Sequence, residues 1–276
     1  MAKKFSRLVS IVLGLSVFLT FSITNSAVAI DGNSNVSIDL STQHIIEPLT
    51  KIEEQESEKK LNEAKKYVAN KRKNQQSTGN IIPYSYGSSK VLSYSFPAYA
   101  QEQSTWCGPA AAFNAIKYVG AITVDYLGNP LSQATLASDT WLKTVSSGGQ
   151  TTFGSNWTST MNGWAPGNNY ARMLASNYGS NWESTFLNSV IWTIDKGYPV
   201  IADTKQHIGA SSTNLSSNYA TDWYNNKDTY HYVVICGYDD VNKKILFSDS
   251  HSSFPGLYWI SVRDMASLTD DFGLVW

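Results

Sequence analysis

Three residues of this sequence have side chains suited to nucleophilic chemistry, and the first of them is a cysteine. Cys107 stands in the string Trp106-Cys107-Gly108-Pro109, at the start of an expected helix. A thiol at a helix N-terminus faces unpaired N–H groups and the positive end of the helix dipole, and both favour the nucleophilic thiolate. A buried, unreactive cysteine is the alternative for a residue judged on its own.

A nucleophilic cysteine needs a base within hydrogen-bond reach, and the chain has four histidines. His44 lies in the N-terminal segment, His207 in a loop-like stretch, and His251 close behind an aspartate. His231 directly precedes the apolar run 232–236, which predicts a buried strand. A histidine at the mouth of a rigid strand is held firmly, which favours His231 as the base. Its position alone is equally consistent with a structural histidine.

The third residue is Asp249, which follows the next apolar run, 244–247, across an expected hairpin connection at 239–243. Neighbouring antiparallel strands place residues near their ends side by side, so Asp249 can orient the ring of His231. We expect this bond at Nδ1, which would leave Nε2 facing the thiol. Asp249 is otherwise an ordinary turn residue, or a metal ligand with His251. No further ligands gather at metal-site spacing, and no cofactor is expected.

Acyl transfer also requires hydrogen-bond donors for the developing oxyanion. Gln101 precedes Cys107 by six residues, and its side-chain amide together with the Cys107 N–H would form a two-donor hole. Gln103 is a rival, and either residue could be a surface glutamine. A serine hydrolase is unsupported, because no G-x-S-x-G string occurs.

The order and spacing of these motifs resemble one known family. Gln101, the Cys107-Gly108-Pro109 string, the strand that begins at His231, and Asp249 resemble the bacterial C39-like cysteine peptidases of the papain-like superfamily. The resemblance covers roughly Val91 to Ser261. It implies a cysteine peptidase in which Cys107 is the nucleophile, His231 the base, Asp249 the orienting residue and Gln101 the oxyanion donor. The expected substrate is a peptide or a protein.

The chain also departs from the family pattern. Ser250 follows Asp249, where many relatives have proline, and no P-loop string accompanies the motifs, unlike in members fused to peptide exporters. The missing P-loop puts leader-peptide processing in doubt and favours a free secreted enzyme. A papain-like cell-wall amidase or endopeptidase is an alternative, because Trp-rich loops could stack on sugars. A non-catalytic surface binding domain is a third interpretation. The four candidate catalytic residues argue against it, because a binding domain has no need of them.

Composition divides the chain near residue 80. The formal net charge of the 276 residues is −1, which gives no electrostatic case for binding nucleic acid. Residues 1–80 carry 11 basic and 8 acidic side chains, whereas all nine tryptophans lie after residue 80. We therefore expect a leader followed by an aromatic-rich, charge-poor body from 81 to 276.

The first 29 residues have the pattern of a secretory signal peptide. Lys3, Lys4 and Arg7 precede the apolar run Leu8–Ile23, and Ala27-Val28-Ala29 is a small-x-small cleavage site. An uncleaved membrane anchor is the alternative, but the run is shorter than the roughly 20 residues that span a bilayer. We expect a bacterial protein that is extracellular or associated with the cell wall, with no stable membrane association after signal removal.

Residues 30–80 are expected to form a pro-segment that acts as the enzyme's own inhibitor. A highly charged helix over 47–74 is followed by a polar linker over 75–80, and the active enzyme would begin near Asn80–Ile82. A charged tail without inhibitory contact is the alternative. The apolar stripe of this helix is thin and consists of Ile52, Leu61, Ala64 and Val68.

The body is expected to be an α+β domain of papain-like type, with an N-terminal catalytic helix packed against an antiparallel sheet. Cys236 should lie buried on the strand with a free thiol, rather than form a disulfide with Cys107. Segments 146–181 and 207–228 are expected to be loops. The expected helices are Cys107–Val119, ended by Gly120, with Leu131–Val145 and Trp182–Lys196; extended segments are expected at 91–99, 198–202, 232–236, 244–247 and 257–262.

Overall fold

The computed structural model describes residues 44–77, 88–207, 213–220 and 228–276. The predicted signal peptide and the predicted cleavage point near Asn80–Ile82 lie outside these residues. Ser41–Trp276 group into one compact unit. Its elements are α1 (Lys51–Ser77), β1 (Ser89–Val91), α2 (Cys107–Val119), α3 (Gln133–Ala137), α4 (Asn156–Trp164), β2 (Arg172–Leu174), η1 (Ala175–Asn177), η2 (Gly179–Asn181), α5 (Trp182–Asp195), β3 (Val200–His207), η3 (Ser217–Ala220), β4 (Asp228–Asp239), β5 (Lys244–Asp249), β6 (Gly256–Ser261), α6 (Val262–Leu268) and β7 (Gly273–Val275).

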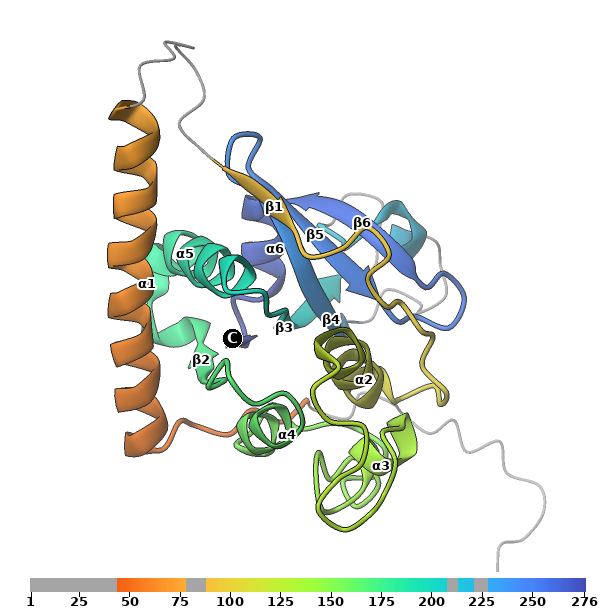
Figure 1. Ribbon diagram of the computed structural model, residues 1–276. Coiled ribbons are helices and arrows are strands. Elements are labelled where there is room, and N and C mark those ends of the chain that lie inside the picture. The colour runs from red at the N-terminus through yellow and green to blue at the C-terminus, as the bar shows by residue number, and fades with distance from the viewer. Residues whose placement is uncertain (1–43, 78–87, 208–212, 221–227) are drawn as a thin grey trace, which may run out of the picture. The chain divides into compact units, whose positions relative to one another are not determined.

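A seven-stranded sheet organises this unit, with strand order β2-β7-β3-β4-β5-β6 and β1 paired with the far end of β4. Its ladders are antiparallel. Figure 1 shows α2 at the lower end of β4, α4 farther below, and α5 between the sheet and the long helix α1. The fold is α+β, as the sequence predicts.

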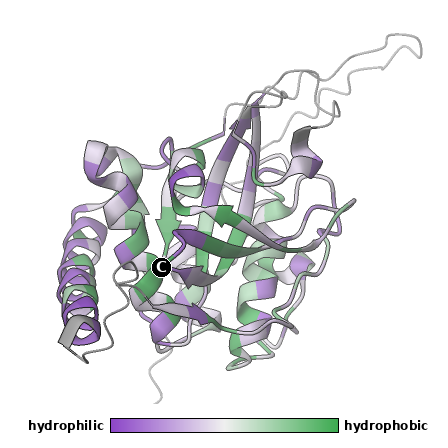
Figure 2. Cartoon of the chain, turned by 90° about the horizontal axis from the view of Figure 1, so that it is seen from above, coloured by the Kyte–Doolittle hydropathy of each residue, from purple (hydrophilic) through white to green (hydrophobic). Residues whose placement is uncertain are grey.

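The two faces of the sheet carry two apolar clusters. Because successive residues of a strand point to opposite faces, Val233 and Ile235 pack towards α5 and α6, and Val234 packs towards α2 and α4. Figure 2 shows hydrophobic residues concentrated along the inner strands and hydrophilic residues on outer turns. Cys236 is buried in the cluster on the α2 side, and both cysteines are free.

Helix α2 has the bounds that the sequence predicts. It begins at Cys107, and Pro109 fits in its first turn, where a missing N–H leaves no bond unmade. Gly120 ends it in the left-handed conformation at φ 65°, and its N–H bonds to the Ile116 carbonyl. The alanine-rich face lets the helix approach β4 closely.

Helix α1 packs against the body. Thr50 and Glu53 form a reciprocal capping box at its start, with N–H to side-chain distances of 2.9 and 3.2 Å. Three of the four expected stripe residues are buried against the α5 side of the core: Leu61, Ala64 and Val68. The expectation for Ile52 is wrong, because its side chain is 68% exposed. The helix continues to Ser77, so the start of the predicted linker is helical.

Several predictions of secondary structure are wrong. Only Gln133–Ala137 of the expected helix 131–145 is helical, because the chain then turns and buries Trp141 and Leu142. The expected loop 146–181 contains α4 and β2. Trp157, Met161 and Trp164 of α4 have helical spacing and are fully buried, but intervening Asn, Ser, Thr and Gly residues weaken the pattern. None of the described helices is long and apolar enough to cross a membrane.

Candidate active site

The start of α2 fixes the position of Cys107. The Trp106 N–H bonds to the Gln103 carbonyl, and the Ala110 N–H bonds back to Trp106, which closes the first turn around Cys107. Residue 108 must be glycine, because a Cβ atom there would lie 2.3 Å from Oγ1 of Thr151. The helix start is therefore pressed against the segment around Thr151, and the thiol is only partly exposed.

His231 lies inside β4 and not ahead of it, which corrects the sequence interpretation. Strand β4 begins at Asp228 because the polar residues 228–231 still pair with β3, where Thr204 faces His231. The hydroxyl of Thr204 also donates to the His231 carbonyl at 2.6 Å. The side chain of His231 is 5% exposed, so a rigid ladder holds the imidazole.

A β-bulge brings Asp249 to the same side as His231. The register of β4 and β5 shifts by one residue between Ile235 and Gly237, so the extra residue is Cys236. Beyond the bulge Val234 pairs with Ser248, which places Asp249 opposite Val233 on the face that His231 shares. Without the shift Asp249 would point to the other face.

The carboxylate of Asp249 is buried, and both of its oxygens take part in hydrogen bonds. Its Oδ1 lies 2.8 Å from His231 Nε2 and accepts the His251 N–H at 2.8 Å. Its Oδ2 accepts the Tyr219 hydroxyl at 2.8 Å. Three donors therefore hold one carboxylate in a fixed orientation.

The expected nitrogen assignment at His231 is wrong. Asp249 bonds Nε2, which leaves Nδ1 for the hydrogen bond between the imidazole and Cys107. The reason is geometric: Nδ1 is the ring nitrogen nearer the main chain, and the thiol sits against the backbone of β4. The Tyr232 N–H donates to the Cys107 sulfur.

The electrostatics of the site favour a charged pair. Burial raises the pKa of the Cys107 thiol, but the hydrogen bond and charge of His231 outweigh it, so the pKa lies below its ordinary value. Burial lowers the pKa of His231, but the charge and hydrogen bond of Asp249 and the bond to Cys107 raise it overall. For Asp249 the opposing burial is outweighed by His231, and its pKa is lowered. The arrangement thus favours thiolate, imidazolium and carboxylate together.

Gln101 lies beside the site, but its amide is engaged. The Gln101 N–H bonds to the Ser250 carbonyl at 2.7 Å, which ties this segment to the end of β5. Its side-chain Nε2 donates to the carbonyls of Gln103 and Ser104, at 2.9 and 2.7 Å. To donate to an oxyanion, Nε2 of Gln101 would have to give up its hydrogen bond with one of these carbonyls. Gln103 itself is exposed.

Two buried polar residues that sequence reasoning missed hold the Gln101 segment. Asn114 on α2 pairs with both main-chain groups of Tyr99, at 3.0 and 3.1 Å. Gln133 on α3 accepts the Glu102 N–H and donates to the Ala100 carbonyl. The signal for Asn114 was available, because it is a lone amide on the alanine-rich face of a helix. Tyr219 was also missed, and its Ser- and Asn-rich surroundings give no signal.

A histidine from the N-terminal segment also reaches the site. His44 Nε2 lies 2.7 Å from Asp203 Oδ2, and both side chains are buried. Its charge contributes to lowering the pKa of Cys107. No local pattern places this histidine near the thiol, because the two residues lie 63 positions apart in the chain.

The tryptophans of the expected loop 146–181 are part of the core. Trp157 and Trp164 are fully buried, and Trp182 after it nearly so. Side chains in that position cannot stack on a carbohydrate, which removes the sequence argument for a sugar-containing substrate from this region.

An α+β domain that pairs a thiol at a helix start with a histidine and a carboxylate on neighbouring strands has the groups needed for nucleophilic acyl transfer. Residues 93–272 match the model of the Peptidase_C39 like family. This match covers well over half of the chain, and the protein belongs to that family of peptidases. No curated protein matches the chain.

Proposed function

We propose that the protein is a secreted cysteine peptidase that hydrolyses peptide bonds through Cys107, His231 and Asp249. The domain is papain-like in this proposal, with α2 as the catalytic helix packed against the antiparallel sheet. The observation that carries it is the hydrogen-bonded chain from the Cys107 thiol through His231 to Asp249. The family match supports a peptidase of the cysteine type.

The reaction begins with attack of the Cys107 thiolate on the carbonyl carbon of the scissile bond. The carbonyl π electrons move to oxygen, and the N–H of Cys107 at the open first turn of α2 donates to this oxyanion. The imidazolium of His231 then protonates the leaving amine as the C–N bond breaks, which leaves a thioester. His231 next removes a proton from water, and the resulting attack releases the acid and restores the thiolate.

Gln101 is the second oxyanion donor in this proposal. Its amide lies in a segment held by Asn114 and Gln133. Binding of substrate would replace the contact of Nε2 with the Gln103 carbonyl by one with the oxyanion. The Gln103 carbonyl still accepts the Trp106 N–H afterwards, so the exchange leaves no buried main-chain group unpaired.

We also infer that the enzyme is exported and made as a zymogen, with the N-terminal segment as inhibitor. Helix α1 packs mainly on α5, so in this proposal it acts as an anchor rather than the inhibitory contact. The segment before α1 is the part that reaches the site, through His44. Turnover measured before and after proteolysis near Asn80–Ile82 tests this proposal. Equal turnover would contradict latency.

The nucleophile is tested by labelling with iodoacetamide at mildly acidic pH, followed by peptide mapping. We expect Cys107 alone to be modified, because its pKa is lowered while burial raises that of Cys236. Cys107→Ala should abolish peptide hydrolysis, and the matched control Cys236→Ala should retain it. Residual hydrolysis by a folded Cys107→Ala protein would contradict the proposed function.

A further inference from the structure

The side chain of His44 fills a pocket with aromatic walls and a carboxylate at its end. Its ring stacks on Tyr230 at a centroid distance of 5.0 Å and an interplanar angle of 10°. Phe272 meets it edge-on at 5.0 Å, and Tyr232 lies tilted at 5.7 Å. Asp203 Oδ2 binds Nε2 at 2.7 Å. We call this set the Asp203 pocket. It suits a flat group that carries N–H donors.

The carboxylate of the Asp203 pocket is stabilised when a cation or a hydrogen-bond donor lies beside it. Asp203 is fully buried, and its Oδ1 has no hydrogen-bond partner among the described residues. Lys205, two residues along β3, is turned away and pairs with Asp228 and Asp271. Burying a carboxylate without a partner costs several kcal/mol. When His44 leaves, another cation or a proton must replace it.

Tyr232 links the Asp203 pocket to the nucleophile. Its main-chain N–H donates to the Cys107 sulfur, while its hydroxyl lies 3.4 Å from His44 Nε2 and donates to the Thr151 carbonyl at 3.0 Å. Thr151 in turn lies against Gly108 at the start of α2. These contacts connect the Asp203 pocket to the thiol, and the charges of His44 and Cys107 influence one another.

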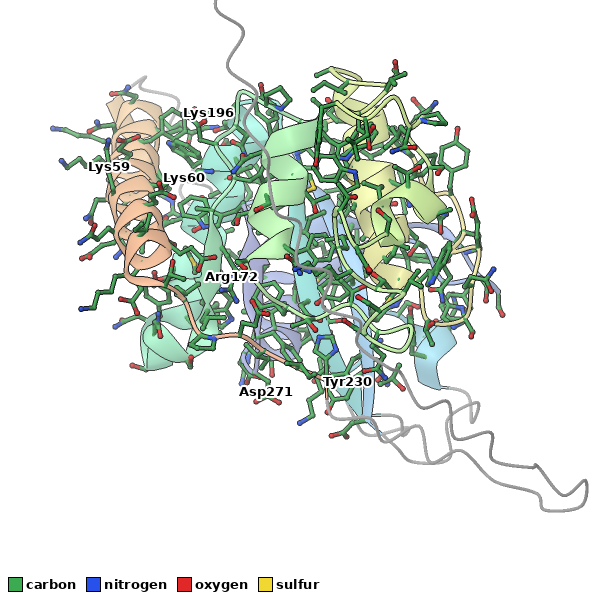
Figure 3. The ribbon with its side chains drawn as sticks, turned by 90° about the horizontal axis from the view of Figure 1, so that it is seen from below. Lys59, Lys60, Arg172, Lys196, Tyr230 and Asp271 are labelled. Atoms are coloured by element: carbon green, nitrogen blue, oxygen red, sulfur yellow. The ribbon has the colours of Figure 1, made fainter. Side chains whose placement is uncertain are left out.

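The main chain that carries His44 lies along the same side of the site as a short added strand. The Phe153 N–H donates to the Ile45 carbonyl at 2.9 Å, and the Glu47 N–H donates to the Phe153 carbonyl at 3.1 Å. The buried guanidinium of Arg172 donates to the carbonyls of Phe153 and Pro48. Figure 3 shows the segment running from α1 past Arg172 towards Tyr230. Extended substrates bind to enzyme backbones in this manner.

We infer that the Asp203 pocket is the subsite that selects a flat cationic side chain of the substrate, histidine or arginine, and that His44 occupies it as an internal stand-in for that residue. This inference rests on the proposed peptidase function and names a determinant of its specificity. Release of His44 would open both the pocket and the Phe153 main chain to a substrate.

Imidazole is the first probe, because it tests the pocket without any hydrolysis. In the full chain, His44→Ala should lower the melting temperature, and added imidazole should restore part of the loss by refilling the cavity. The same variant combined with Asp203→Asn should gain nothing from imidazole. Asp195→Asn is the matched control, since Asp195 also pairs with a cation of the N-terminal segment, Lys71, away from the pocket. Equal restoration with and without Asp203 would overturn the inference, as would no restoration by imidazole in His44→Ala.

Paired peptides are the second probe, identical except for one residue scanned across the scissile bond as His, Arg, Ala or Glu. His44→Ala should cleave the His and Arg peptides with kcat/KM roughly tenfold or more above the Ala peptide, the factor expected for one hydrogen bond to a charged group. Adding Asp203→Asn to His44→Ala should abolish this preference in kcat/KM for the His and Arg peptides over the Ala peptide. Adding Asp195→Asn instead should preserve the preference. An unchanged ratio without Asp203 would overturn the inference. Absence of turnover on every peptide would contradict the proposed function, and the imidazole result then decides the pocket alone.

Discussion

Two buried histidine–aspartate pairs flank the thiol, and they differ in how completely their groups are satisfied. His231 and Asp249 meet at 2.8 Å, and His44 and Asp203 at 2.7 Å, in both cases through Nε2. Asp249 accepts further bonds from Tyr219 and the His251 N–H. Asp203 Oδ1 has no partner among the described residues. The first pair is fixed within its surroundings, whereas the second is complete only while His44 is docked.

The pKa values of the two carboxyl groups express this difference. For Asp249 the charge of His231 and several hydrogen bonds outweigh burial, so its pKa is lowered. For Asp203 burial outweighs the effect of His44, so its pKa is raised. A buried polar network is rigid when it is fully satisfied and costly when a partner is missing, so Asp249 is held firmly and Asp203 depends on His44.

Loss of the Asp249 charge should have the largest effect. Asp249→Asn should lower kcat roughly 10²–10⁴-fold with little change in KM, because an amide cannot accept three hydrogen bonds or stabilise the imidazolium. His251→Ala should change kcat little, because the hydrogen bond to Asp249 comes from the main-chain N–H, which alanine retains. Steady-state kinetics on one peptide measure both. The reverse ranking would mean that the orienting residue is misassigned.

Loss of the Gln101 amide should rank second. Gln101→Leu should lower kcat about 10²–10³-fold if the side chain donates to the oxyanion, the range for removal of one such donor. The melting temperature of the same variant reports on its contacts with the carbonyls of Gln103 and Ser104. A protein that melts earlier but keeps its kcat would assign Gln101 to the turn alone.

The pH profile of kcat/KM should separate the two pairs. Activity should fall on the acid side as the Cys107 thiolate is protonated, below its ordinary pKa, and on the alkaline side as His231 loses its proton, above its ordinary pKa. The raised pKa of His231 depends on the Asp249 charge, so Asp249→Asn should move the alkaline limb to lower pH. Asp203→Asn, which leaves this pair intact, should move that limb much less. Equal shifts would show that the two carboxylates act as one system.

Removal of the Tyr219 hydroxyl should give the smallest effect. Tyr219→Phe deletes one of three donors to Asp249, and kcat should fall about tenfold, near the lower value for a hydrogen bond to a charged group. The alkaline limb should stay near its wild-type position, because Asp249 remains ionised and keeps its charge beside His231. A purely structural role for Tyr219 would change the melting temperature without lowering kcat.

Helix α2 and the hairpin of the candidate site could be predicted because their signals are local. Gly120 ends α2 since only glycine takes a left-handed C-cap at little cost. The turn between β4 and β5 also follows from neighbouring residues, with Lys243 in the left-handed region at φ 53°. Helix α3 was overpredicted because burial of Trp141 and Leu142 in turns overrode the propensity of the segment.

The sequence by itself determined the chemical types at the site: one thiol at a helix start, one imidazole next to a buried apolar run and one carboxylate close behind the next apolar run. Only the tertiary structure decided their partners. The bulge at Cys236 selects the face of Asp249, and the main chain of β4 selects Nδ1 of His231 for the thiol. Docking of the N-terminal segment brings His44 to Asp203 across 159 residues. Register, ring orientation and long-range docking depend on the packing of distant segments, and no local pattern of residues encodes them.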